Sequence, residues 1–414
     1  EYWRVTGAFQ PANQKTNKPD NQFSAELVSH KKKKYEVKDT HKLFDGDYTV
    51  TKTSITSKEK VDAIIADLAA PYKISAVDKK EITRMPYPPY TTSTLQQAAG
   101  RVLGFSSKRT MNVAQKLYEE GHITYHRTDS VFLSDKFLTA AAEFISKEYG
   151  AKYALSKPRA FVNKAKLAQE AHEAIRPTNV ATGEHLPGAG EFNRDHHKLY
   201  ELIWKRAMAS QAAPAVFDST TIQITTANDY LFQTNGSIIK FDGYLAIMGR
   251  DSEDTILPAV AVGDVVALVS HTPQQKFTDA PPRYSEAKLI KSLEEHGIGR
   301  PSTYAPTIAT IEERQYVERL ERRVFAPTEL GNTVNDFLVK YFGEIINLPF
   351  TANIEDELDE VADGKRKWES VLSEFYVPFA KQLTKADEKA EKMLVPVEET
   401  DELCPKCGKP VVIR

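Results

Sequence analysis

Short runs of apolar and β-branched residues alternate with polar turns over roughly the first 85 residues, and this pattern predicts β-strands. Tyr2–Val5 and Tyr48–Ser54 are clear examples. The run Lys31–Lys34 lies between two such strands, and we expect a solvated hairpin tip, although four lysines also suit a phosphate backbone. The proline-rich segment Met85–Tyr90 is too stiff to continue a strand or helix, so we expect a domain boundary there.

Apolar residues then recur at helical spacing from residue 91 to about residue 214. One predicted helix has Leu117 on its apolar face and ends at Gly121. Another begins at Ser134, a residue type that caps helix N-termini, and ends at Gly150. The connection between them, GHITYHRTDS at residues 121–130, is therefore expected to be a short extended segment held by two helices.

The pattern returns to β from residue 215 to about residue 275, in segments that alternate or run apolar between turn residues. These segments are 217–226, 229–241, 242–249 and 262–270. Two β-rich blocks thus flank the helical block. We therefore expect one β domain formed by two separate stretches of chain, with a helical domain inserted between them.

A helix, a glycine turn, a second helix and a β-hairpin are predicted next. Ser285 is expected to cap the first helix, and Ser302 or Thr303 to open the second. Two short strands, Val317–Leu320 and Arg322–Phe325, follow. This order is that of a winged-helix-like unit, which frequently binds nucleic acid.

Residues 344–395 predict more helix, and charge-rich, mobile chain is expected from Lys385 to Glu402. The acidic run Glu355–Glu360 could suggest a metal site. Because Leu358 interrupts the run at core spacing, we interpret it as the solvated face of an amphipathic helix.

Length and composition limit the class of protein. A chain of 414 residues predicts two to four domains, and no apolar run is long enough to span a membrane. The formal net charge is −2, so any contact with nucleic acid must depend on local patches. The first residues resemble a strand entered in the middle of a fold, without an initiator Met, so we expect a piece of a longer protein.

The two cysteines, Cys404 and Cys407, stand in the sequence CPKCG. This usage excludes a disulfide framework and fits a reducing cytoplasm. The pair is half of a four-ligand zinc module, which two further ligands would have to complete.

Candidate chemistry is concentrated in GHITYHRTDS, where Tyr125 and Arg127 precede Thr128, Asp129 and Ser130. A tyrosine hydroxyl has an ordinary pKa of about 10, and a nearby guanidinium favours the phenolate and binds phosphate oxygens. Together these groups could attack a phosphodiester. The ordinary alternative is a strand tyrosine followed by polar turn residues.

A second candidate is AHEAIRPTNV, with His172, Glu173 and Arg176. On a helix, His172 and Arg176 would share a face and present themselves together to an anion. A zinc-binding HExxH motif would need histidine where Arg176 stands. A surface salt-bridge cluster is the alternative.

The winged-helix-like unit carries local positive charge. Arg300 lies in the glycine turn before a helix N-terminus, a position suited to a phosphate. For the arginines in and near the hairpin, a solvated basic face is the stronger alternative. They are Arg314, Arg319, Arg322 and Arg323.

These motifs, taken in order, resemble those of bacterial type IA DNA topoisomerases over essentially the whole chain. The matching stretches are PYTTSTLQQAAGRVLGFSSKRTMNVAQKLYEEGHITYHRTDS, AHEAIRPTNV, FDGYLAIM, EHGIGRPSTYAPTIATIEERQYV, PTELG, FTANIEDELDEVADGKRKW and CPKCG. The resemblance implies a transient single-strand break in negatively supercoiled DNA, made by Tyr125 through a 5′-phosphotyrosyl link. Strand passage and religation would follow without ATP, and no Walker-type loop is found in the sequence.

By motif position, Arg127 resembles the family's contact to the scissile phosphate, and His172 and Arg176 resemble residues lining the same site. Arg300, Thr303 and Arg314 fall in the motif that borders the family's single-stranded DNA groove. We count Ser302, Thr128, Asp129 and Ser130 as DNA-binding on the same motifs.

The implied fold is mixed α and β and multidomain, with a helical gate domain inserted in a split β-arch domain and followed by a winged-helix-like base domain. We expect the arch at 1–85 and 214–280, the gate at 86–213, and the base at 281–395. A linker and the start of a zinc-ribbon module are expected at 396–414. The resemblance also implies a monomer.

Two departures qualify the resemblance. The family's Mg²⁺-binding acidic cluster and the earlier half of the base domain do not occur in the sequence, so we expect this chain alone to bind single-stranded DNA weakly without relaxing it. His126 stands where an apolar residue is expected and would add a group titrating near pH 6–7. The alternatives are a non-catalytic nucleic-acid-binding protein and a tyrosine recombinase; the latter leaves a 3′ link and carries its tyrosine late in the chain.

Overall fold

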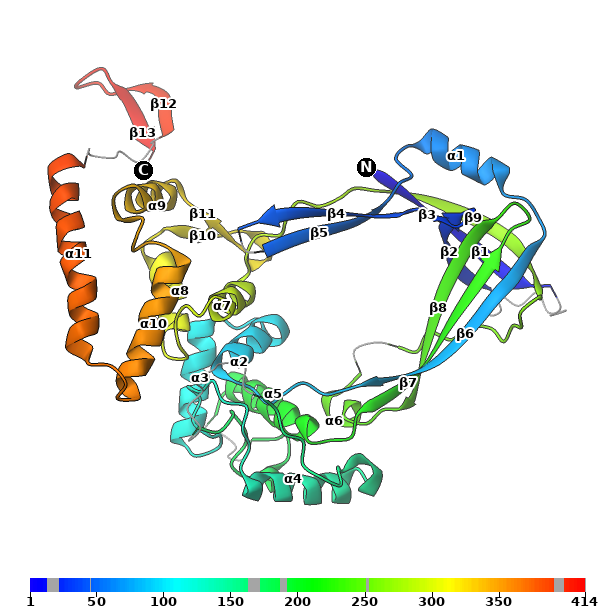
Figure 1. Ribbon diagram of the computed structural model, residues 1–414, viewed down its shortest axis with the longest axis horizontal. Helices are drawn as coiled ribbons and strands as arrows, with labels where there is room; N and C mark the ends of the chain where they lie inside the picture. Colours follow the sequence, from blue (N-terminus) through cyan, green and yellow to red (C-terminus); the bar gives the residue numbers. More distant parts are fainter. Residues whose placement is uncertain are drawn as a thin grey trace. The chain divides into compact units, whose positions relative to one another are not determined.

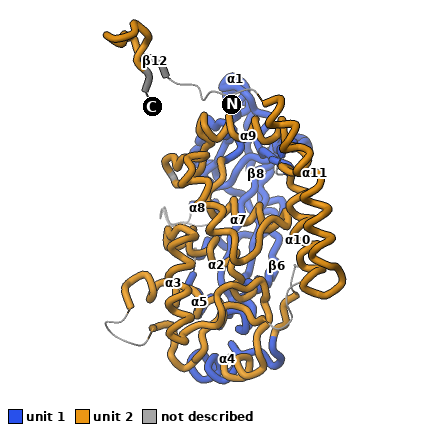
Figure 2. The backbone as a smooth tube through the Cα atoms, turned by 90° about the vertical axis from the view of Figure 1, so that its left-hand side faces the viewer, with its two compact units in different colours: residues 1–87, 142–158, 208–282 blue, residues 88–141, 159–207, 283–414 orange. Residues whose placement is uncertain are grey.

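The computed structural model describes residues 1–12, 22–44, 46–162, 172–186, 192–250, 253–390 and 398–413. It is a mixed α and β protein whose elements can be followed in Figure 1. The chain divides into two compact units, each made of three separate stretches (Figure 2). Unit 1 comprises 1–87, 142–158 and 208–282, and unit 2 comprises 88–141, 159–207 and 283–414.

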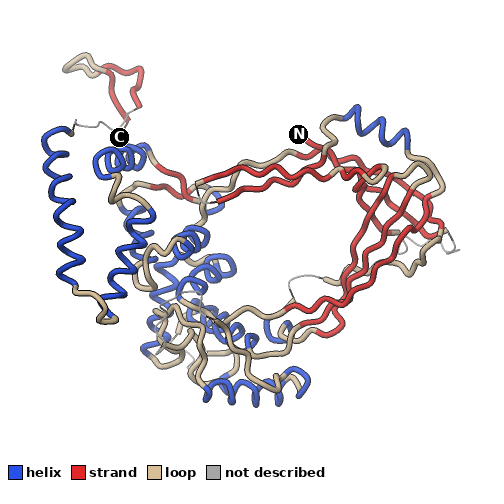
Figure 3. The backbone as a smooth tube through the Cα atoms, in the orientation of Figure 1, coloured by secondary structure: helices blue, strands red, loops and turns tan. Residues whose placement is uncertain are grey.

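Unit 1 is built on one seven-stranded sheet in the order β1-β9-β6-β7-β8-β2-β3 (red in Figure 3). Its strands are β1 (Tyr2–Pro11), β2 (Phe23–His30), β3 (Lys33–Lys34), β6 (Tyr72–Arg84), β7 (Ala215–Thr225), β8 (Tyr230–Phe241) and β9 (Val265–Lys276). Strand β1 pairs with β9 along one edge and with β2 along the other. The sheet therefore closes into a barrel, and strands from both ends of the unit's sequence contribute to it.

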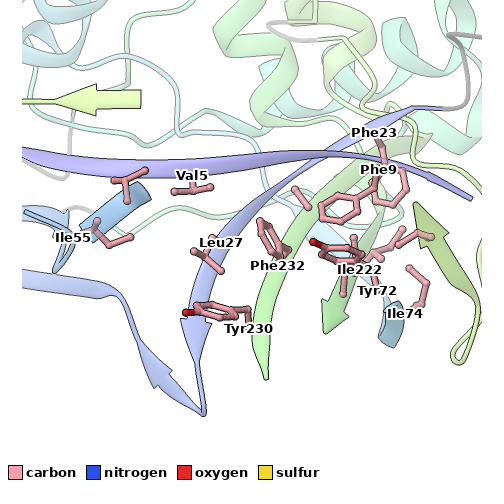
Figure 4. Close-up of a cluster of buried hydrophobic side chains, with 14 residues drawn as sticks. Val5, Phe9, Phe23, Leu27, Ile55, Tyr72, Ile74, Ile222, Tyr230 and Phe232 are labelled. Atoms are coloured by element: carbon pink, nitrogen blue, oxygen red, sulfur yellow. The ribbon is translucent and has the colours of Figure 1, made fainter. Parts of the chain in front are cut away.

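Alternating residues of these strands fill the barrel interior, as the side chains in Figure 4 illustrate. Phe9 and Phe232 are fully buried, with ring centroids 5.2 Å apart. Burying a large apolar side chain contributes about 1.5–3 kcal/mol. The cluster combines residues from both β-rich blocks, which confirms that one β structure is formed by two separate stretches of chain.

The turn between β2 and β3 is formed by Lys31 and Lys32, with φ of 49° and 66°. All four lysines are exposed, so the predicted hairpin tip is confirmed. A second hairpin, β4 (Glu36–Leu43) with β5 (Gly46–Thr53), and helix α1 (Lys58–Asp67) complete the first stretch.

One predicted strand of unit 1 is wrong. Residues 242–249 form a turn and the short helix α6 (Leu245–Met248). The backbone reverses at Gly243, whose φ is +50° and where a Cβ would lie 2.2 Å from the carbonyl oxygen of Pro214. The apolar run that suggested a strand thus packs as one helical turn.

Unit 2 is mostly helical (Figure 3). Its first two stretches contain α2 (Thr92–Ala98), α3 (Ser107–Glu119) and most of α5 (Arg194–Ser210), while α4 (Asp135–Glu148) begins in unit 2 and ends in unit 1. The third stretch contains α7 (Glu286–Glu295), α8 (Tyr304–Glu313), β10 (Val317–Arg319), β11 (Phe325–Pro327), α9 (Glu329–Phe342), α10 (Leu348–Ala362) and α11 (Trp368–Lys389). The strands β12 (Glu398–Leu403) and β13 (Pro410–Ile413) form a separate hairpin.

The predicted helix, glycine turn, helix and hairpin are present. The side chain of Ser285 accepts a hydrogen bond from the backbone N–H of Lys288 and caps α7, as expected. The second strand lies later than predicted, because Arg323 has a φ of 58° and a helical turn precedes it. The shift buries Phe325 against Ile290 and Ile308.

Two expectations for the last helices are wrong. Leu358 is 50% exposed, so it does not anchor α10 to a core. Lys385–Lys389 belongs to α11, whereas residues 391–397 of the expected linker lie outside the described residues. None of the described helices is long and apolar enough to cross a membrane.

Candidate active site

A cavity of about 450 Å³ lies within unit 2 and is lined by most of the candidate residues. Four segments that are distant in sequence meet here: 125–129, His172, the α7–α8 region and α10. The lining residues are Tyr125, Arg127, Thr128, Asp129, His172, Glu294, Gly299, Arg300, Pro301, Ser302, Tyr304, Asp356 and Asp359. The fold thus brings together groups from the GHITYHRTDS, AHEAIRP and GRPST motifs.

Tyr125 lies on the predicted connection between two helices. Gly121, with φ of 76°, ends α3, and Thr124 then donates its backbone N–H to the carbonyl of Arg176 at 2.9 Å. The Tyr125 side chain is 41% exposed. Its ring contacts Tyr118 and His172, with centroid distances of 5.2 and 6.2 Å. A phenol is thereby held rigid at its base and open to a substrate at its tip.

Thr128 and Ser130 are buried and hold the backbone of this segment. The Thr128 N–H donates to the Thr92 hydroxyl at 2.9 Å, and the Ser130 N–H donates to the Thr128 hydroxyl at 3.0 Å. Thr128 and Asp129 line the cavity, whereas Ser130 does not. These short polar residues therefore fix the loop, and Ser130 is set apart from the cavity.

His126 is only 3% exposed, and neither ring nitrogen has a hydrogen-bond partner among the described residues. Burial first, and the positive charge of Arg127 second, lower the pKa of His126 from 6.5 to about 4. The expectation that it titrates near pH 6–7 is therefore wrong. The imidazole is neutral at pH 7 and packs as an apolar ring against Tyr118 and Tyr125.

Arg127 and His172 line the same cavity as Tyr125. The Arg127 side chain is exposed and pairs with no carboxylate in the described part of the chain. It also lines an adjoining depression with Ser302. A guanidinium without a protein partner is available to bind an anion.

Arg176 and Arg314 lie away from the cavity lining. Arg176 forms an ion pair with Glu173 at 2.5 Å and donates to the Ser134 hydroxyl at 3.2 Å. Residues 172–178 are extended, because Ile175 pairs with Tyr90, so the expected shared helix face of His172 and Arg176 is wrong. The pairing with Glu173 agrees with the salt-bridge alternative, although both side chains are largely buried.

Arg314 ends α8, at the opposite end from the cavity. Thr303, at the start of α8, does not line the cavity either. Its hydroxyl accepts a hydrogen bond from the Arg300 N–H at 2.8 Å and so shapes the turn.

Arg300 is already engaged with acidic residues of α10. Its Nη2 lies 2.7 Å from a carboxylate oxygen of Asp359, and its Nη1 lies 3.8 Å from one of Glu355. The interpretation of Glu355–Glu360 as a solvated face is therefore wrong for these two residues. Their spacing of four places them on one helix face, which the sequence could have indicated.

Glu294, Tyr304, Asp356 and Asp359 line the cavity although none was predicted as a site residue; the two aspartates belong to the acidic run Glu355–Glu360. Burial, and next the charge of Glu294, raise the pKa of Tyr304, so this phenol stays protonated. The Ser93 hydroxyl donates to Glu294 at 2.7 Å. Glu294 lies just outside the matching motifs and Tyr304 is one residue of a long motif, so only the fold shows that both line the cavity.

No metal site is found among the described residues: no three His, Cys, Asp or Glu side chains are grouped to hold an ion. The cavity carboxylates consequently do not fit a Mg²⁺ site by themselves. Cys404 and Cys407 lie in a tight turn, where backbone hydrogen bonds lower the pKa of the Cys404 thiol. Two thiols do not complete a tetrahedral zinc site.

Comparisons with known proteins agree on one family. The family model for DNA topoisomerase matches residues 1–373. DNA topoisomerase 1 of Vibrio cholerae is 44% identical over 87% of this chain and 41% of that protein. DNA topoisomerase 1 of Haemophilus influenzae is 40% identical over 100% of this chain and 45% of that protein.

Among solved structures, full-length topoisomerase I from Thermotoga maritima matches with a TM-score of 0.72 and 31% identity. The match covers 99% of this chain and 62% of that chain. The chain therefore spans less than half the length of these two sequence relatives and less than two thirds of the solved one.

Proposed function

The chain belongs to the bacterial type IA DNA topoisomerase family, and from this membership we propose that it is the strand-cleaving core of such an enzyme. The proposed reaction relaxes negatively supercoiled DNA through a transient single-strand break. The observation that carries the proposal is the exposed Tyr125 in a cavity that is also lined by Arg127, which pairs with no carboxylate among the described residues.

In the proposed chemistry, the Tyr125 oxygen attacks a backbone phosphorus of single-stranded DNA. A Tyr–O–P bond forms on the 5′ phosphate, the P–O3′ bond breaks, and the proton lost from the phenol is balanced by one gained at the 3′ oxygen. Religation reverses these steps. Because the bond energy is conserved in the phosphotyrosyl link, no ATP is needed.

Arg127 is proposed to bind the non-bridging oxygens of the scissile phosphate, where its charge also stabilises the transition state. His172, whose ring lies against that of Tyr125, would contact the same anion. Thr128, Asp129, Arg300 and Ser302 would contact the neighbouring DNA. Ser130, Arg176, Thr303 and Arg314 lie outside the cavity, so we assign them to supporting the site or to contacts further along the strand.

We propose that the enzyme uses Mg²⁺ held by residues outside this chain. A bound magnesium ion would neutralise phosphate charge near the cleavage point. Zinc bound at Cys404 and Cys407 would likewise need two further ligands. We also propose that the protein is a monomer that acts on DNA in the cytoplasm.

We propose further that residues 86–213 form a gate inserted in an arch made of 1–85 and 214–280, on a winged-helix-like base at 281–395. The barrel strands on either side of a largely helical stretch support the insertion of the gate in the arch. Opening of the gate would let a second strand pass through the break.

The test is covalent trapping with the full-length enzyme, made by joining this chain to the remaining parts of its gene product. Single-stranded DNA labelled at either end is cleaved and the reaction is stopped with denaturant. We expect a covalent adduct at the 5′ end, its loss in Tyr125→Phe, and its retention in Tyr118→Phe. Tyr118 is a matched control, because its ring contacts that of Tyr125 and is equally 41% exposed.

A Tyr125→Phe protein that still became trapped would refute the assignment, and a 3′ adduct would indicate recombinase chemistry. The same assay examines a second candidate, a non-catalytic single-stranded nucleic-acid-binding protein. That candidate rests on the same cavity, where Arg127 could bind a DNA phosphate without any cleavage taking place. We expect the 414-residue chain to bind DNA weakly without relaxing it.

A further inference from the structure

The acidic face of α10 is directed at a basic cavity residue. Glu355 and Asp359 are four residues apart, and both approach the Arg300 guanidinium, at 3.8 and 2.7 Å. All three side chains are only 22–33% exposed. Charge-assisted hydrogen bonds in such partly desolvated surroundings are stronger than those on an open surface.

These contacts restrain a side chain that would otherwise be flexible. The Arg300 Nη1 donates to the carbonyl of Gly299 at 3.0 Å, and Nη2 donates to Asp359 at 2.7 Å. The backbone N–H of Arg300 is itself held by the hydroxyl of Thr303. A guanidinium has five N–H donors, so donors remain for a phosphate after these bonds are made.

We infer that Asp359, assisted by Glu355, is a positioning residue that holds Arg300 ready for a DNA phosphate in the cavity. The inference rests on the proposed function, because it takes DNA as the ligand. The Arg300 side chain loses its conformational entropy before DNA binds. DNA binding is therefore stronger than it would be with a mobile arginine.

The alternative role of Asp359 is repulsion: like any carboxylate in the cavity, it would repel the DNA phosphates and weaken DNA binding. The two roles predict opposite signs. Removing a positioning carboxylate weakens binding, whereas removing a merely repulsive one strengthens it.

Asp356 provides the matched control. It lies on the same helix, lines the same cavity and carries the same charge, but it forms no ion pair with Arg300 in the described structure. Asp363, which pairs with Lys365 near the end of α10, controls for a general effect on the helix.

The experiment measures binding of the 414-residue chain to a fluorescent single-stranded oligonucleotide by anisotropy, in a double-mutant cycle. We expect Arg300→Ala to weaken binding and Asp359→Ala to weaken it about three- to tenfold, which lies in the lower part of the range for coupled side chains in contact. In the Arg300→Ala background, Asp359→Ala should no longer weaken binding. Asp356→Ala should leave binding equal or stronger, and Asp363→Ala should leave it unchanged.

Asp359→Asn keeps an oxygen acceptor and should weaken binding by a smaller factor. It replaces Asp359→Ala in the cycle if circular dichroism finds that variant unfolded. Binding that is unchanged or stronger in both Asp359 variants would overturn the inference, as would a weakening that persists without Arg300. If Arg300→Ala itself leaves binding intact, the assignment of Arg300 in the proposed function fails. This result is distinguishable from one in which only the inference about Asp359 fails.

Discussion

Acid is expected to destabilise unit 2 through His126, and the substitution His126→Leu should remove this part of the acid sensitivity. The imidazole is 3% exposed and has no hydrogen-bond partner among the described residues, so a charged form is poorly accommodated. A folded pKa of about 4, against an ordinary value of 6.5, corresponds to about 3 kcal/mol at roughly 1.4 kcal/mol per pH unit.

The sign follows from proton binding to the two states. Above pH 6.5 the imidazole is neutral in both the folded and the unfolded chain, so its full contribution to stability is retained. As the pH falls from 6.5 towards 4, the unfolded chain binds a proton and the folded chain does not. Stability attributable to His126 therefore falls by about 1.4 kcal/mol by pH 5.5 and about 2.5 kcal/mol by pH 4.5.

The assay is urea unfolding followed by circular dichroism at pH 7.5, 5.5 and 4.5. Carboxylates titrate in both proteins, so the difference between wild type and His126→Leu isolates the histidine. His185→Leu is the control, because the His185 side chain is 89% exposed. The reasoning would be refuted if wild type and His126→Leu lost the same free energy of unfolding between pH 7.5 and pH 4.5.

Two further predictions concern packing and polar contacts. Phe232→Ala should lower the free energy of unfolding of unit 1 by about 3–5 kcal/mol, because it opens a cavity in the barrel core. Urea unfolding measures this loss, and Val269→Ala is the control because Val269 is half exposed. Glu286→Gln should cost about 1–3 kcal/mol. Glu286 accepts the backbone N–H and hydroxyl of Ser107 and pairs with Arg319 at 2.7 Å, so hydrogen exchange should rise at the start of α3; unchanged exchange there would argue against this.

Local features of the fold were well predicted from the sequence, because they depend on neighbouring residues. Ser285 caps α7 by a bond to a residue three positions later, and Gly121 ends α3 through its own backbone freedom. The segment carrying Tyr125 could therefore be placed between two helices. The hairpin tip at Lys31–Lys34 followed in the same way.

Features that depend on distant residues were not predictable. The family pattern expects an apolar residue at position 126, which hints at burial, but the packing of the His126 ring against Tyr118 and Tyr125 appears only in the fold. The pairing of Arg300 with Asp359 joins residues 59 positions apart. The exposure of Leu358 was not predictable either, because helical spacing identifies a face of a helix but not which residues cover that face.

Closure of the barrel in unit 1 has a consequence for how the chain acquires its structure during synthesis. Strand β1 pairs along its length with β9, so Tyr2 lies opposite Lys276. A ribosome must therefore add more than 250 residues after β1 before β9, the partner on one of its two edges, exists. Until then the open edge of β1 is a template for pairing with other chains. Because such long-range closure is slow, the barrel is expected to fold later than the helices encoded between β1 and β9, and to be prone to aggregate before it does.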